Sequence, residues 1–241
     1  MKNLIKAEWF KLSKSFGFKV LLLFNAASLF SNIFLLMAGA KGEGYKMFAI
    51  ALTYILHHSV IGYLFSALYL SSEFSGRTFG TSLLCGCSRR KIFLSKALVF
   101  LAGLIILFLV YVGVSTTVIS VGNGFGMEFS AKTCKEILLM LLCGMLACIT
   151  MGAVILLVTV IVKKAVAAIG AGIIITYSLL WLEANFSENL VFLKYTYSYQ
   201  MGQLEFFGEG FSPVVFLGVM VVTFLLAFAA AGFIFERTEL K

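Results

Sequence analysis

Few residues of this chain could carry out catalysis. His57 and His58 are the only histidines, there is no aspartate, and all 11 acidic residues are glutamates. No G-x-x-x-x-G-K-[ST] sequence occurs, so the chain cannot cradle ATP phosphates in a Walker A loop. The cysteines are irregularly spaced, which predicts neither a zinc site nor a disulfide framework; they are Cys85, Cys87, Cys134, Cys143 and Cys148. We therefore expect no catalytic activity in this chain, no metal and no bound cofactor.

Polar residues within apolar stretches form a second group of candidates. Asn25, Ser28 and Asn32 lie at i, i+3 and i+7, so they share one face of a helix, and Thr53 and His57 lie at i and i+4. Polar groups at membrane depth are costly and face a partner helix or a water-filled path. Two interpretations stay open. Asn25, Asn32 and His57 line a translocation path, or these groups form hydrogen bonds between helices, worth about 0.6–2 kcal/mol each.

The stretch 71–96 concentrates charged and aromatic residues between two apolar runs. Its only acid is Glu73, and a lone acid in a basic loop suggests a specific partner. Arg89, Arg90 and Lys91 precede the next apolar run, where basic residues also set membrane topology. The pattern predicts a short amphipathic helix followed by a basic return to the membrane.

The elements that position these residues follow from hydropathy. Hydrophobic residues make up 61% of the chain and charged residues 12%, against about 25% charged in a soluble domain, and the mean hydropathy is +1.03. A membrane span needs about 20 apolar residues and must be helical in lipid. The sequence therefore predicts an all-α integral membrane protein with six transmembrane helices. They cover approximately 20–37, 48–70, 97–121, 137–162, 165–182 and 214–235.

The distribution of charge predicts the orientation of these spans. With both termini in the cytoplasm, cytoplasmic segments carry 14 of the 19 Lys and Arg residues but only four of the 11 glutamates. This is the bias of the positive-inside rule. It assigns the net charge of +8 to the membrane surface rather than to nucleic-acid binding.

Two segments outside the spans have patterns of their own. Ile5, Trp9, Leu12 and Phe16 form one stripe in residues 1–18, which predicts an interfacial amphipathic helix; the alternative is a solvated basic tail. Residues 183–213 form the longest external segment, in which we expect short helices with tyrosines as interface anchors.

Small residues repeat every four positions in three spans, which permits close helix packing within one subunit or between two copies. These residues are Gly144, Cys148 and Gly152, then Ala168 and Gly172, then Ala227 and Ala231.

The 71–96 loop also holds a series of short motifs in a fixed order: Glu73-Phe74, Gly76-Arg77-Thr78, Leu83-Leu84, Ser88-Arg89, Ile92-Phe93 and Lys96. These motifs and the layout of the chain together resemble the membrane subunits of ABC-2-type ABC transporters. The family shares an N-terminal amphipathic helix, six spans, a cytoplasmic loop after the second span and an external helical segment before the sixth. Cys85-Gly86-Cys87 departs from the proline that often precedes Ser-Arg in the family.

The resemblance implies that the loop carries a coupling helix that docks on an ABC ATPase subunit, with Glu73, Phe74, Arg77 and Thr78 in or near the contact. It further implies two ATPase copies that use ATP and Mg, and a second permease copy, either a homodimer or a sister permease. Short members resemble the permeases of bacitracin, lantibiotic and phenol-soluble-modulin exporters. We therefore expect export of amphipathic or antimicrobial peptides across a bacterial plasma membrane.

Two other functions remain as alternatives. A secondary transporter or channel that works without an ATPase would need an ion site at midplane, and the predicted spans hold acids only at their ends. A passive membrane immunity protein would need no coupling helix.

Overall fold

The computed structural model describes residues 1–27, 44–75, 88–207 and 211–237, and within these ranges every regular element is helical. The helices are α1 (Lys2–Lys14), α2 (Phe16–Ala27), α4 (Gly44–Thr53), α5 (Ile55–Ser66), the π-helical turn η1 (Ala67–Ser71), α6 (Ser72–Ser75), α8 (Arg89–Asn123), α9 (Ala131–Val162), α10 (Ala165–Phe186), the 3-10 turn η2 (Val191–Tyr195), α11 (Tyr197–Gly202), the 3-10 turn η3 (Gln203–Phe206) and α12 (Pro213–Arg237).

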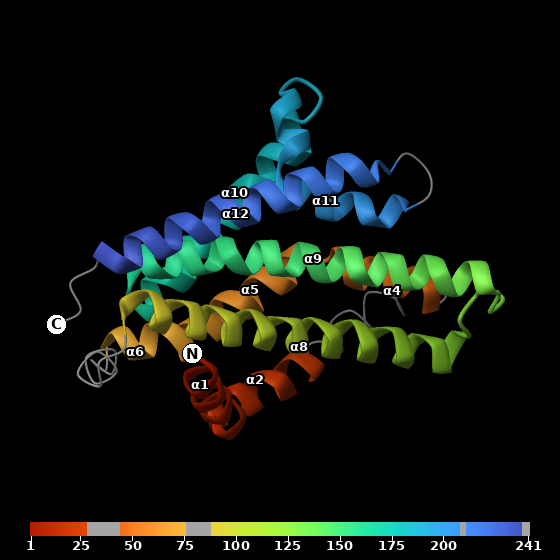
Figure 1. Ribbon diagram of the computed structural model, residues 1–241. Coiled ribbons are helices and arrows are strands. Elements are labelled where there is room, and N and C mark those ends of the chain that lie inside the picture. The colour runs from red at the N-terminus through yellow and green to blue at the C-terminus, as the bar shows by residue number, and fades with distance from the viewer. Residues whose placement is uncertain (28–43, 76–87, 208–210, 238–241) are drawn as a thin grey trace.

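Long helices lie side by side in a bundle (Figure 1). Helix α9 lies between α8 and α12, α4 and α5 pack behind them, and α1 and α2 lie along the outside of α8. Side-chain contacts bring α1, α6, the start of α8 and the end of α12 together at one end of the bundle. At the other end, the N–H of Gly44 at the start of α4 donates to the carbonyl of Gly124 after α8, at 3.0 Å.

Four described helices are long and apolar enough to cross a membrane: α8, α9, α10 and α12. Helices α4 and α5 together make a fifth span if the bent pair is counted as one. Helix α2 is apolar but short, and the predicted first span continues into residues 28–37, which lie outside the described residues. The prediction of a helical membrane protein is therefore confirmed, while six spans and cytoplasmic termini stay predictions.

The second predicted span, 48–70, is not one straight helix. It bends by 52° at Tyr54, between α4 and α5. The Thr53 hydroxyl donates back to the carbonyls of Ala49 and Ile50, and the ring of His58 bonds the carbonyl of Ala51 at 2.8 Å. Side chains that enter the helical hydrogen-bond ladder are a known cause of bends without proline.

Two segment boundaries also differ from the sequence prediction. Helix α8 already begins at Arg89, so residues 89–96 of the predicted 71–96 loop are helical. With 35 residues, α8 is about 50 Å long and exceeds a hydrocarbon core of about 30 Å. The predicted helix 1–18 ends at Lys14, because Ser15 adopts an extended conformation and α2 starts at Phe16.

The predicted stripe of α1 does not form a single apolar face. Leu12 is 2% exposed and packs into the core, whereas Trp9 is 43% exposed and Phe16, now in α2, is 80% exposed. The face of α1 that meets the bundle includes Glu8, whose carboxylate contacts Lys96 of α8. The face of α1 that packs on the bundle thus combines apolar side chains with this ion pair.

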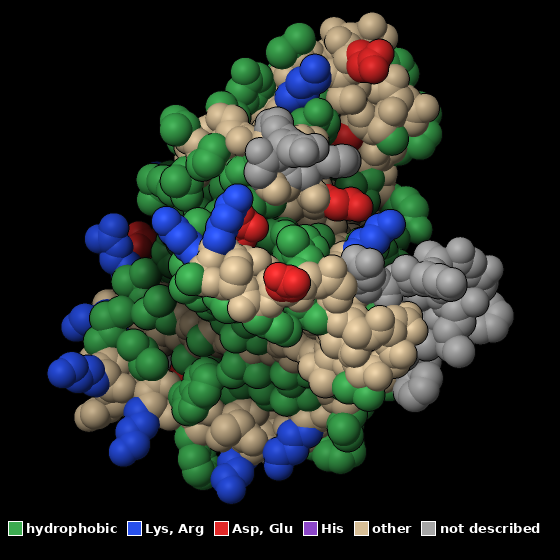
Figure 2. Space-filling view, turned by 90° about the vertical axis from the view of Figure 1, so that its right-hand side faces the viewer, with side chains coloured by type: hydrophobic (Ala, Val, Ile, Leu, Met, Phe, Trp, Pro, Cys, Tyr) green, Lys and Arg blue, Asp and Glu red, His purple; other side chains and the backbone are tan. Residues whose placement is uncertain are grey.

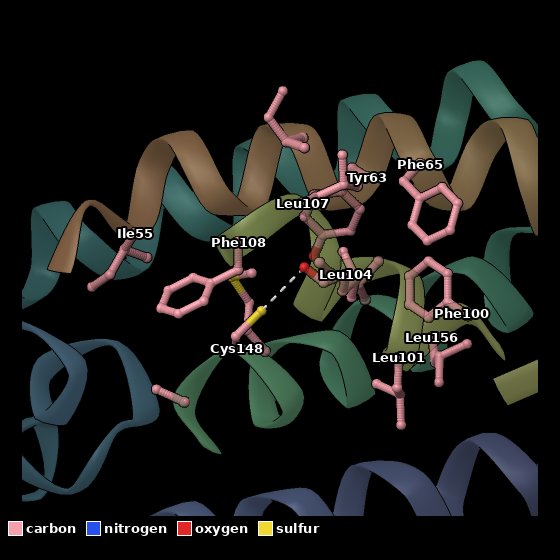
Figure 3. Close-up of a cluster of buried hydrophobic side chains, with 14 of the residues drawn as sticks. Ile55, Tyr63, Phe65, Phe100, Leu101, Leu104, Leu107, Phe108, Cys148 and Leu156 are labelled. Carbon is pink, nitrogen blue, oxygen red and sulfur yellow. Dashed lines mark hydrogen bonds between the residues drawn. The ribbon is translucent and has the colours of Figure 1, made fainter. Parts of the chain in front are cut away.

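The core is built from aromatic and branched side chains of α5, α8 and α9 (Figure 3). Phe65 and Phe100 stack with ring centroids 5.0 Å apart. Cys148 is buried, and its thiol lies 3.9 Å from the carbonyl of Leu104, in agreement with its expected packing role.

The small residues pack inside the subunit. A Cβ atom at Gly172 would come within 2.2 Å of the Tyr63 ring, and one at Gly152 within 2.6 Å of Leu101. Ala168, Ala227 and Ala231 are buried as well. These contacts lie within one chain, and contacts of the small residues between two copies stay a prediction.

The outer surface is largely apolar between scattered charges, as Figure 2 shows for the end of the bundle on the right of Figure 1. Among the four long apolar helices, α10 and α12 are much less buried in the bundle than α8 and α9. Exposed side chains on them include Val166, Ile174, Val214 and Leu226. Such surfaces suit contact with lipid.

We expect Gly172→Ala to destabilise the protein, because the added methyl group overlaps the Tyr63 ring. Overpacking of this kind costs about 1–3 kcal/mol. Thermal unfolding in a mild detergent measures the effect. Gly170→Ala is the matched control, since Gly170 lies on the same helix and an added methyl group there would meet no atom within 4 Å. An equal loss of stability in both variants would contradict the prediction.

Candidate coupling site and intramembrane polar cluster

Glu73, the predicted contact residue for an ATPase, lies buried in α6 with 4% exposure. One carboxylate oxygen accepts from the ammonium of Lys11 in α1, and the other from the ammonium of Lys96 in α8. The described contacts of this acid are thus with two lysines of its own chain. Contact between Glu73 and a second protein stays a prediction.

Lys96 connects Glu73 to a second carboxylate. Its Nζ atom lies 2.7 Å from Oε1 of Glu8 in α1. The other Glu8 oxygen, Oε2, accepts from the Tyr69 hydroxyl in η1 at 3.0 Å. Glu8, Lys11, Glu73 and Lys96, with Tyr69, form one network, which we call the ion cluster.

The ion cluster satisfies the conditions under which charges can be buried. The side chains of Lys96 and Glu73 are each 5% exposed and that of Glu8 is 12% exposed, so desolvation costs several kcal/mol per ion. Two carboxylates balance two ammonium groups, and each carboxylate accepts two charge-assisted or hydroxyl hydrogen bonds. Removal of Lys96 would leave the Glu8 carboxylate without its countercharge.

Phe74 follows Glu73 and faces a different helix. Its ring lies 6.1 Å from that of Phe235 near the end of α12. Arg90 at the start of α8 pairs with Glu236 at 3.3 Å, and Arg89 donates to the Glu236 carbonyl at 2.9 Å. The described ends of the 71–96 loop are therefore fixed to α12 as well as to α1.

Arg77 and Thr78, the other two predicted coupling residues, lie outside the described residues, as does Asn32 of the predicted translocation path. Their assignments stay predictions.

Asn25 and His57, predicted from separate patterns, meet in the bundle interior. The His57 Nε2 atom lies 2.8 Å from Oδ1 of Asn25, and Nδ2 of Asn25 donates to the Leu107 carbonyl at 2.8 Å. With the amide in this orientation, Nε2 of His57 carries the proton. Asn25 thus joins α2 to α5 and α8, while Thr53, expected on the His57 face, bonds back to its own helix.

Aromatic rings enclose this polar pair. The His57 ring stacks on Tyr111 with centroids 4.0 Å apart and lies 5.9 Å from Tyr54. Asn25 is 1% exposed. The sequence left two interpretations open, a translocation path or a hydrogen bond between helices. The burial and pairing of Asn25 and His57 agree with the hydrogen bond.

A third polar group lies at the far end of α10. Glu183 is 7% exposed, and its Oε1 atom accepts from the hydroxyls of Thr196 and Ser198. Thr196 caps α11 by accepting from the Tyr199 N–H at 3.3 Å. Burial raises the pKa of the neighbouring Tyr197, which is held neutral. Glu183 therefore fastens the segment after α10 to the bundle.

The sequence did not reveal that Glu8, Tyr69 and Lys96 meet around Glu73, although Lys96 was among the residues that carry the family resemblance. Lys96 is 88 residues from Glu8, and no local spacing rule links such positions. One signal was available: Glu8 is the only acid before residue 43, in a segment that topology alone would leave entirely basic.

Within the described ranges no group of three or more His, Cys, Asp or Glu side chains could hold a metal ion. The three described cysteines are free thiols.

Comparison with known families assigns the class of protein. Residues 4–179 match the profile described as ABC-2 family transporter protein. This match spans well over half of the 241 residues, and the chain belongs to this family of membrane permeases. A search of curated proteins gives no match.

We expect Asn25 and His57 to be energetically coupled. In a double-mutant cycle with Asn25→Ala and His57→Ala, the interaction energy should be about 0.6–1.7 kcal/mol, the range for hydrogen bonds between membrane helices. Thermal unfolding in detergent provides the measurement. The control cycle pairs Asn25→Ala with Thr53→Ala and should be additive; additivity in the His57 cycle too would contradict the assigned bond.

We also expect Glu183→Ala to loosen the segment after α10, because the buried Ser198 hydroxyl and the half-buried Thr196 hydroxyl both lose a carboxylate acceptor. Hydrogen bonds to a charged group contribute about 1.5–3 kcal/mol each. Limited proteolysis within residues 187–207 should become faster. Glu188→Ala is the matched control, since Glu188 is exposed on the same segment, and equal cleavage rates for the two variants would be evidence against this role.

Proposed function

We propose that this chain is the membrane-spanning permease subunit of an ATP-driven exporter, with six spans and both termini in the cytoplasm. ABC ATPase subunits, in two copies, hydrolyse ATP with Mg and act on the 71–96 loop. A second permease copy, identical or a sister subunit, completes the transport path. The cargo is an amphipathic or antimicrobial peptide, and the location is a bacterial plasma membrane.

Membership of the ABC-2 family is the observation that carries the permease assignment. The arrangement of helix ends supports the proposed place of ATPase contact. Both described ends of the 71–96 loop, α6 and the start of α8, lie with α1 and the end of α12 at one end of the bundle. An ATPase that binds the loop would therefore also lie next to the two terminal helices.

The charge pattern supports the orientation. Lys11, Arg89, Arg90 and Arg237 all belong to helix ends that meet at this end of the bundle. The positive-inside rule assigns such an end to the cytoplasm, where ATP is available.

The peptide cargo rests on the resemblance to short exporter permeases. The buried hydrogen bond between Asn25 and His57 leaves those two residues as helix connectors in the described conformation. A cargo path that used them would require this bond to open.

The first test is purification of the tagged chain from its native membrane in mild detergent, with mass spectrometry and an ATP hydrolysis assay on the eluate. We expect a stoichiometric ABC ATPase and ATP hydrolysis. Arg77→Glu should reduce the recovered ATPase by about tenfold or more, because reversal of a charge in an interface commonly costs several kcal/mol.

Lys132→Glu is the control, because Lys132 is exposed in the first turn of α9, at the opposite end of the bundle. It should leave recovery unchanged. A clean eluate without any nucleotide-binding partner would overturn the permease proposal and favour a transporter that works without an ATPase.

A further inference from the structure

We propose that Glu8 and Lys96 are positioning residues of the coupling site: Lys96 binds the carboxylates of Glu8 and Glu73 at once and thereby holds α1 and α6 as one body. The start of the 71–96 loop then moves together with α1. The clamp itself follows from the described contacts, whereas its part in ATP-driven transport rests on the proposed function.

The geometry of Lys96 supports the clamp. It lies two turns into α8, and its side chain is 5% exposed. Its ammonium contacts one carboxylate from α1 and one from α6, two helices that are far apart in the chain. Since a lysine ammonium has three donors, it can satisfy both carboxylates together.

Two further contacts join α1 directly to the segment formed by η1 and α6, and neither involves Lys96. Lys11 pairs with Glu73, and the Tyr69 hydroxyl of the π-helical turn η1 donates to Glu8. Both polar side chains of α1 that meet the bundle, Glu8 and Lys11, are thus engaged by the same short region, 69–73. A displacement of α6 would therefore reach α1 by three routes, which are the Lys11–Glu73 pair, the Tyr69–Glu8 hydrogen bond and the Lys96 bridge.

The ion cluster is better suited to fix geometry than to raise stability. Replacement of a buried ion network by neutral or apolar groups is often neutral for stability, whereas removal of one partner is strongly destabilising. An apolar contact would also allow α1 to slide or rotate, because dispersion forces have little directionality. Charge-assisted hydrogen bonds fix both distance and orientation.

The neighbouring pair Arg90–Glu236 provides a natural contrast. It lies at the same end of the bundle, but its side chains are 80% and 44% exposed. Exposed pairs contribute little to structure because water and salt screen them. Neutralising this pair removes charges at the same end of the bundle without affecting the buried network.

The test uses the full chain in lipid nanodiscs and measures hydrogen exchange of the α1 amides together with thermal unfolding. Three variants are compared with wild type: Lys96→Met, the triple variant Glu8→Gln/Glu73→Gln/Lys96→Met, and the control Arg90→Gln/Glu236→Gln. Glu8→Gln alone is a milder fourth variant, which keeps the Lys96–Glu73 and Lys11–Glu73 pairs.

We expect Lys96→Met to lower the unfolding temperature and the triple variant to restore most of it. In the triple variant, α1 amides should exchange about tenfold faster or more, the factor expected when hydrogen bonds to charged groups are lost. Glu8→Gln should give an intermediate rate, and the control should match wild type. Wild-type exchange in both the triple variant and Glu8→Gln would overturn the clamp.

In the complex with its ATPase, Glu8→Gln/Lys96→Met, which keeps Glu73 and its pair with Lys11, should retain ATP hydrolysis but move about tenfold less cargo per ATP, whereas Lys132→Glu at the opposite end of the bundle should transport normally. Transport at the wild-type ratio in Glu8→Gln/Lys96→Met would overturn the role of the clamp in coupling. Failure of wild type to recruit an ATPase would instead refute the proposed function, and the exchange rates of α1 would still decide whether the clamp exists.

Discussion

A charge that leaves water has to meet its countercharge inside the protein, and this constraint determines how one end of the molecule is assembled. Lys96 is buried at the level where α8 passes α1 and α6, so two carboxylates must be brought to it. Glu8 of α1 faces the bundle, whereas Trp9 is exposed. Glu73 joins α6 to α1 and α8. A few side chains thus determine the relative position of three segments.

Close packing has the corresponding role in the apolar interior. Where two helices approach most closely, one supplies a glycine and the other a large side chain, as with Gly172 and Tyr63 or Gly62 and Ile155. Lipid offers no hydrophobic drive for helix association, so fit and dispersion contacts hold such pairs together. The few hydrogen bonds between helices, such as Asn25 to His57, add direction to contacts that packing alone would leave adjustable.

Hydropathy, which depends only on local composition, was sufficient to predict a helical membrane protein, and the order of residues in the 71–96 loop together with the layout of the spans indicated its family. The sequence also selected Asn25 and His57, because polar residues stand out in an apolar run. The bend at Tyr54 and the rotation of α1 were not predictable in this way. The bend involves the hydrogen bond between the His58 ring and the Ala51 carbonyl, and the orientation of α1 involves the ion pair between Glu8 and Lys96. The periodicity of a single segment does not predict either contact. Arg77, Thr78 and Asn32 lie outside the described residues, so their predicted roles still rest on the sequence alone.

The bend at Tyr54 divides the second predicted span into two helices, α4 and α5, which have different neighbours. Helix α4 is joined to α8 and to the residues after it, through the Gly44–Gly124 hydrogen bond and the ring contact between Tyr45 and Phe125. Helix α5 is packed instead against α9 and α10 and continues through η1 into α6. The regular helix is interrupted between them, so the two halves of the bent pair are anchored to different neighbours. A change in the tilt of α5 would therefore alter the angle at Tyr54 before it displaced α4.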